Sequence, residues 1–139
     1  MKSIPFGKPL IGKVEKKEIQ QVLEGPILTH GPKCLEFEKK FAEYIGVKYA
    51  ITTSNCTTAI HLSLESLDLK KEDEVIVPAM THVATAHAVE HLGAKPIFVD
   101  ILAETGCISP DGIEKAITKK TKAIIPVHFV GLPCEMDKI

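Results

Sequence analysis

The sequence predicts an α/β fold with three layers, in which helices cover both faces of a mainly parallel sheet. The prediction depends on the alternation of two kinds of segment. Runs such as Glu74 to Pro78 (EVIVP) and Pro96 to Asp100 (PIFVD) are mostly apolar, and segments with a helical spacing of apolar residues lie between them. Strands without a polar face are typical of parallel sheets that are buried on both sides.

The individual elements follow from apolar periodicity and from the residues that end it. Phe37, Phe41 and Ile45 recur at the spacing of one helix face, and Gly46 follows as a stop. Gly25-Pro26 ends an earlier helical pattern in the same way. The full prediction is helices over residues 14–23, 34–45, 59–67, 83–92 and 113–117, and strands over residues 49–53, 74–78, 96–100 and 122–129.

Composition excludes several classes of partner. The 139 residues are the size of one domain, and no repeat or Gly-rich linker divides them. The 17 Lys and Arg nearly balance the 18 Asp and Glu, so the basic surface of a nucleic-acid binder is missing. No apolar run reaches the roughly 18 residues of a membrane span. The four cysteines form no C-x-x-C pair, so we expect reduced thiols in a cytoplasmic protein that binds neither nucleic acid nor membrane.

The turn over residues 52–58 (TTSNCTT) is the strongest candidate for a binding site. It joins a predicted strand to a predicted helix, and its hydroxyl and amide side chains suit a helix N-terminus. Unpaired backbone N–H groups and the positive end of the helix dipole make such a place favourable for a phosphate group. The alternative is a plain helix cap without a ligand. Neither of the common nucleotide-binding glycine loops is present.

Histidines supply two further candidates. His87-x-x-Glu90-His91 fits the H-x-x-E-H pattern of a group of zinc peptidases, with two imidazoles one helical turn apart. A catalytic zinc needs a third protein ligand, and the sequence marks none clearly. His82 follows the predicted strand 74–78, so we expect it at the same rim as the turn, where it could stack on a flat ring or serve only in packing.

Taken in order, the segments of this chain resemble the DegT/DnrJ/EryC1/StrS family of sugar aminotransferases. The resemblance runs through IPFGKPLIG, GPILTHGP, FEKKFAEYIGVKYAITTSNCTTAIHLSL, DEVIVPAMTHVATAHAV, GAKPIFVDI and TKAIIPVHFVGLPCEMD. It implies the aspartate aminotransferase fold and the cofactor pyridoxal 5'-phosphate (PLP). Residues 1–139 would be the N-terminal part of the PLP-binding large domain, with residues 1–33 as an arm and loop.

The resemblance also implies roles for particular residues. Asn55, Cys56 and Thr57 would hold the cofactor phosphate, and His82 would stack on the pyridine ring, where the family usually has an aromatic residue. Thr29 and Gly31 would lie near the substrate, in a homodimer with shared active sites. The reaction implied is transfer of an amino group, from a donor such as glutamate, to a keto-sugar nucleotide in polysaccharide or amino-sugar biosynthesis.

The family's Schiff-base lysine and the aspartate that pairs with the pyridine nitrogen correspond to positions beyond Ile139. No lysine of this chain lies in the family's Ser-x-x-x-Lys context, so no catalytic residue is assigned. We therefore expect residues 1–139 alone to be inactive, because PLP chemistry needs that lysine as covalent anchor and proton carrier. The alternatives are a non-catalytic protein that binds a phosphate ligand, such as a vestigial paralogue, and the zinc peptidase.

Overall fold

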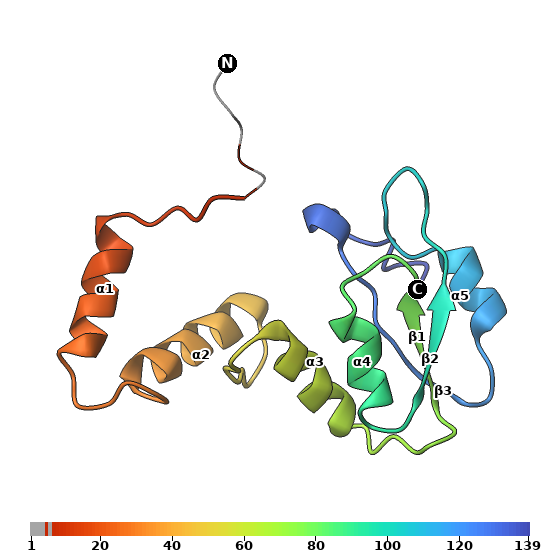
Figure 1. Cartoon of the computed structure of the whole chain (residues 1–139), viewed down its shortest axis with the longest axis horizontal. Helices are drawn as coiled ribbons and strands as arrows, with labels where there is room; N and C mark the ends of the chain where they lie inside the picture. Colours follow the sequence, from red (N-terminus) through yellow and green to blue (C-terminus); the bar gives the residue numbers. More distant parts are fainter. Residues whose placement is uncertain (1–4, 6) are drawn as a thin grey trace. The chain divides into compact units, whose positions relative to one another are not determined.

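The computed structural model describes residue 5 and residues 7–139, and the chain divides into two units, Met1–Thr52 and Thr53–Ile139 (Figure 1). Each unit is described by itself. None of the helices in these described residues is long and apolar enough to cross a membrane.

The first unit contains two helices, α1 (Lys13–Leu23) and α2 (Pro32–Ile45), which confirms both predictions for this region. Helix α1 begins where the Glu15 carboxylate accepts a hydrogen bond from the Gly12 N–H at 2.6 Å. Helix α2 begins with Pro32, whose missing N–H costs nothing in a first turn. It ends at Gly46, which adopts the left-handed conformation (φ 79°) that closes many helices.

The second unit is built on a parallel sheet of three strands in the order β2-β1-β3. The strands are β1 (Glu74–Pro78), β2 (Lys95–Val99) and β3 (Thr121–Ile124). The central position of β1 explains its uniformly apolar sequence, since Val75, Ile76 and Val77 are all 0% exposed. The predicted parallel sheet is confirmed.

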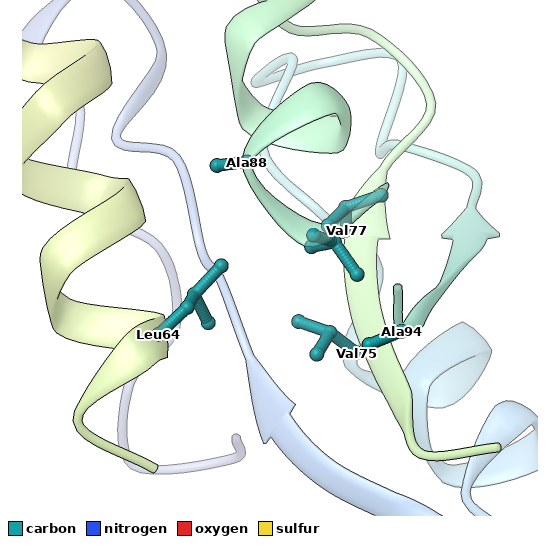
Figure 2. Close-up of a cluster of buried hydrophobic side chains, with 6 residues drawn as sticks. Leu64, Val75, Val77, Ala88 and Ala94 are labelled. Atoms are coloured by element: carbon teal, nitrogen blue, oxygen red, sulfur yellow. The ribbon is translucent and has the colours of Figure 1, made fainter. Parts of the chain in front are cut away.

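Helices cover both faces of this sheet, as the sequence predicts. The helices are α3 (Cys56–Glu65), α4 (Ala84–Glu90) and α5 (Pro110–Ala116), and a short 3-10 helix, η1 (Phe129–Gly131), follows β3. Alternate residues of β1 point to opposite faces. Val75 and Val77 pack with Leu64 of α3 and Ala88 of α4 (Figure 2), whereas Ile76 packs in a separate cluster with α5. The result is three layers with a hydrophobic core on each side of the sheet.

Two predicted strands differ from the structure. Residues 49–53 form no strand, because a strand requires a neighbour for its hydrogen bonds and none of the described residues supplies one. The side chain of Ile51 is accordingly 82% exposed. The strand predicted over 122–129 ends at Ile124, and its last ladder hydrogen bond runs from the Ile125 N–H to the Ile76 carbonyl at 2.9 Å. Pro126 follows and has no N–H to continue the ladder.

Candidate functional site

The turn before α3 is a well-formed helix cap. Asn55 has extended backbone angles, and its Oδ1 accepts hydrogen bonds from the Thr58 N–H (2.9 Å) and the Thr58 hydroxyl (3.1 Å). The Thr53 hydroxyl donates a hydrogen bond to the Asn55 carbonyl at 3.1 Å, which links the residues just before the helix to its cap. The predicted N-terminal position of Asn55 is confirmed, and hydrogen bonds within the turn itself define its shape.

Cys56 and Thr57 occupy the first two positions of α3, and this leaves donors available at the turn. Their backbone N–H groups take part in no hydrogen bond within residues 53–139, and the Thr57 hydroxyl has no partner there. Both residues are exposed to solvent. Two unpaired N–H groups at the positive end of a ten-residue helix, with a hydroxyl beside them, suit a phosphate group. The structure therefore presents at Cys56 and Thr57 the donors that a bound phosphate requires.

His82 lies after the carboxyl end of β1 and is exposed. Its Nδ1 accepts a hydrogen bond from the Ala84 N–H at 3.1 Å, so the neutral ring carries its proton on Nε2. That bond fixes the ring near the start of α4, a helix that packs against α3. Within residues 53–139 no hydrogen bond connects His82 with the turn at Asn55.

Thr29 and Gly31 belong to the first unit. Gly31 is the N-terminal cap of α2, and its carbonyl accepts a hydrogen bond from the Cys34 N–H at 3.0 Å. A side chain at position 31 would crowd Ile27, because a Cβ would lie 3.2 Å from the Ile27 carbonyl oxygen. Gly31 also lines an open, largely apolar pocket of about 200 Å³ between the end of α1 and the start of α2. Thr29 does not line this pocket.

Helix α2 makes one interaction that no sequence motif predicts. The Glu38 carboxylate on α2 accepts two hydrogen bonds from Thr52, one from its N–H and one from its hydroxyl, both at 2.8 Å. These hydrogen bonds, first that of the N–H and then that of the hydroxyl, lower the pKa of Glu38, while partial burial of the carboxylate opposes this shift. Because 14 residues separate the partners, no short spacing rule indicates the contact.

The histidines of the H-x-x-E-H pattern lie on α4 and at its end. The rings of His87 and His91 stack with centroids 6.0 Å apart, and His61 of α3 meets His91 edge-on at 6.2 Å. In the part of the chain that the structure describes, no group of three or more His, Cys, Asp or Glu residues is placed to hold a metal ion. The zinc hypothesis therefore gains no third ligand from the described residues.

This chain is similar to two curated proteins and to solved structures of a putative sugar aminotransferase. Over 136 residues, 98% of this chain and 35% of the relative, it is 49% identical to the uncharacterized protein MJ1066 of Methanocaldococcus jannaschii. It is 43% identical to the spore coat polysaccharide biosynthesis protein SpsC of Bacillus subtilis, again over 98% of this chain and 35% of the relative. The structure of the putative sugar aminotransferase Spr1654 from Streptococcus pneumoniae is 40% identical with a TM-score of 0.91, over 97% of this chain and 34% of that one.

The chain thus spans about a third of the length of the relatives it matches. The family model for DegT/DnrJ/EryC1/StrS aminotransferases matches residues 9–139, which include most of the first unit, the whole of the second and the turn at Asn55. The matched solved structure is similar over nearly the whole of this chain, so sequence and fold agree. The chain belongs to the DegT/DnrJ/EryC1/StrS aminotransferase family.

Proposed function

We propose that residues 1–139 are the N-terminal part of the large domain of a PLP-dependent aminotransferase, with residues 1–33 as an arm and loop. The enzyme transfers an amino group to a keto-sugar nucleotide. The observation that carries the proposal is the pair of unpaired N–H donors at Cys56 and Thr57 in a chain of this family. Solved structures of Spr1654 in a PLP form and a PMP form, the latter named for the aminated cofactor, support the choice of cofactor.

The residues of the turn fit the phosphate of PLP. The Cys56 and Thr57 N–H groups and the Thr57 hydroxyl are donors without partners in residues 53–139, and the cap formed by Asn55 already holds them in place. A phosphate therefore gains hydrogen bonds without first breaking any in the protein. The helix dipole adds a favourable interaction with the negative charge.

His82 is proposed to lie against the pyridine ring. Its imidazole is planar, and the hydrogen bond from Ala84 to Nδ1 restricts its rotation, so a flat partner would meet a ring that is already oriented. When bound, PLP supplies the electron sink that stabilises negative charge next to the substrate nitrogen. The described residues of this chain contribute binding and orientation to that chemistry.

The finer parts of the proposal are the substrate, the amino donor and the assembly. The name of SpsC, a spore coat polysaccharide biosynthesis protein, supports a nucleotide sugar that is used for surface polysaccharide. Glutamate is proposed as donor, and a homodimer with shared active sites as the assembly, with Thr29 and Gly31 near the substrate. The four free cysteines support a cytoplasmic location.

An amino-transfer assay with the full-length protein tests this proposal. Incubation with PLP, 15N-labelled glutamate and a panel of keto-sugar nucleotides should yield an amino sugar that carries the label, detected by mass spectrometry. Residues 1–139 alone should show no turnover under the same conditions, because the lysine that anchors PLP in this family is not among them. A sugar product without nitrogen, or PLP binding without any product, would contradict the assignment; the second outcome would favour the non-catalytic alternative.

A further inference from the structure

Residues 79–83 connect β1 to α4 within the second unit, and His82 is one of them (Figure 1). The cap residue of α4 is Val83, whose side chain has no hydrogen-bonding group. His82 serves the first turn instead. Its Nδ1 accepts a hydrogen bond from the Ala84 N–H at 3.1 Å, and its carbonyl accepts one from the Thr85 N–H at 3.0 Å. One residue thus satisfies two of the N–H groups that a helix start leaves unpaired, so the orientation of the imidazole depends on how the backbone enters α4.

Thr85 is the only buried polar residue among those that the structure describes, with 4% of its surface exposed. The other buried residues of α4 are apolar: Ala84, Ala86, Ala88 and Val89. Burial of a hydroxyl costs free energy unless the hydroxyl is hydrogen-bonded. The Thr85 hydroxyl lies 3.0 Å from the Thr81 hydroxyl, and either oxygen can be the donor. A valine of the same shape would avoid the cost, so this hydrogen bond, and not packing, explains a hydroxyl at position 85.

The hydrogen bond between Thr81 and Thr85 closes a short loop that contains His82. On the side of the sheet, the Ala79 N–H donates to the Val99 carbonyl at 2.8 Å, which holds the chain to β2 as it leaves β1. The backbone on both sides of His82 is therefore held to regular structure. We propose that Thr85 is a positioning residue for the His82 imidazole and acts through its hydrogen bond with Thr81. The proposal depends on the proposed function for the identity of the ring that the imidazole meets.

The hydrogen bond to Nδ1 is sensitive to the backbone beside it. Only Val83 lies between His82 and Ala84, so a small rotation of the backbone at His82 turns the imidazole away from the Ala84 N–H. Hydrogen bonds weaken steeply as their geometry departs from linear. Without its bond to Thr81, Thr85 would no longer restrain that rotation, and the imidazole would sample further rotamers. A flat ligand would then meet a ring that is not held in one orientation.

Three variants of the full-length protein test the proposal. Thr85→Val keeps the shape of the side chain and removes the hydroxyl, whereas Thr85→Ser keeps the hydroxyl and removes the methyl group. Thr118→Val is the matched control, because the Thr118 hydroxyl donates to Glu74 at the opposite, amino end of β1. Hydrogen exchange at the Ala84 and Ala88 amides of the PLP-free protein is followed by mass spectrometry. PLP binding is followed by the change in its absorption spectrum.

In Thr85→Val we expect exchange at Ala84 to rise by about tenfold, exchange at Ala88 to stay the same, and the PLP Kd to weaken by about three- to tenfold. Thr85→Ser and Thr118→Val should stay within about twofold of the parent protein in PLP binding and in exchange at Ala84. A merely structural role for Thr85 predicts the opposite ranking, because serine leaves a small cavity in the core and valine does not.

Unchanged exchange at Ala84 in Thr85→Val overturns the proposal. So does a Thr85→Ser variant that loses protection at Ala84 as strongly as Thr85→Val, since a retained hydroxyl would then not hold His82. The variant His82→Ala separates this proposal from the proposed function. If His82→Ala binds PLP as tightly as the parent, the stacking role of His82 fails, while exchange at Ala84 still decides whether Thr85 positions the imidazole. If His82→Ala binds PLP more weakly but Thr85→Val does not, the positioning role of Thr85 fails.

If Thr85→Val does not fold, Thr81→Val replaces it. This variant removes the other hydroxyl of the pair, at a residue that is only partly buried. It should raise exchange at Ala84 and weaken PLP binding in the same direction as Thr85→Val. A Thr81→Val variant that matches the parent in both measurements overturns the hydrogen bond between Thr81 and Thr85 as the link to His82.

Discussion

Two substitutions of Asn55 separate the stability of the α3 cap from the binding of an anion beside it. Asn55→Ala removes the acceptor of two hydrogen bonds from Thr58. Loss of such a cap typically costs about 1 kcal/mol in the free energy of unfolding. Asn55→Asp keeps an acceptor oxygen in the same place and adds a negative charge at the positive end of the helix. The charge should stabilise the helix by about 0.3–1 kcal/mol, which offsets any weakening of the cap's hydrogen bonds.

The two variants should rank differently in phosphate binding. A carboxylate at position 55 lies next to the donors of Cys56 and Thr57, where a phosphate is proposed to bind. For a single negative charge about 6 Å from a phosphate dianion in a water-like medium, Coulomb's law gives a repulsion of about 1.4 kcal/mol. That repulsion corresponds to a roughly tenfold weaker Kd. Asn55→Asp should thus be as stable as the parent and yet bind PLP worse.

Urea unfolding monitored by circular dichroism measures stability, and titration with PLP at two salt concentrations measures binding. The tenfold loss in Asn55→Asp should shrink at high salt, because salt screens the repulsion between exposed charges. Unchanged PLP binding by Asn55→Asp would refute a phosphate site at this helix start. An Asn55→Ala variant as stable as the parent would refute the assignment of Asn55 as an energetically important cap.

Two further predictions concern the core of the second unit. Ile76→Ala should lower the free energy of unfolding, measured in urea, by about 2–5 kcal/mol, because Ile76 is 0% exposed in the middle strand. The control Ile117→Ala, at a residue that is 53% exposed, should cost less than about 1 kcal/mol. Gly106→Ala should lower the free energy of unfolding by at least about 1 kcal/mol, since Gly106 has a φ of 71° and a Cβ there would lie 2.5 Å from Phe129 Cδ1. A thermal unfolding midpoint equal to that of the parent protein would contradict this prediction.

The helices are the part of the fold that the sequence predicts best. Gly46 ends α2 and Asn55 begins α3 because each residue acts on backbone groups within one helical turn of itself. Strand β1 is predictable for a related reason, since an uninterrupted apolar run is stable only when both faces are buried. Even the early end of β3 has a local signal in Pro126, whose missing N–H stops the ladder.

The candidate site is predictable only in part. The turn at Asn55, Cys56 and Thr57 can be recognised from its residue types, because a helix start needs capping oxygens and leaves its first N–H groups free. The roles of these residues toward PLP and the ring-stacking role of His82 come from the resemblance to the family and stay predictions. The donors that the structure leaves unpaired at the turn are consistent with the first of these predictions.

By itself the sequence determined the local elements, the apolar strand at the centre of the sheet and the family to which the chain belongs. Only the tertiary structure decided the strand order, the absence of a strand over residues 49–53 and the attachment of Thr52 to Glu38. The physical reason is the separation along the chain over which each interaction acts. Capping and periodicity act over a few neighbouring residues, whereas a strand needs a partner and a carboxylate needs donors that the fold brings from far along the chain.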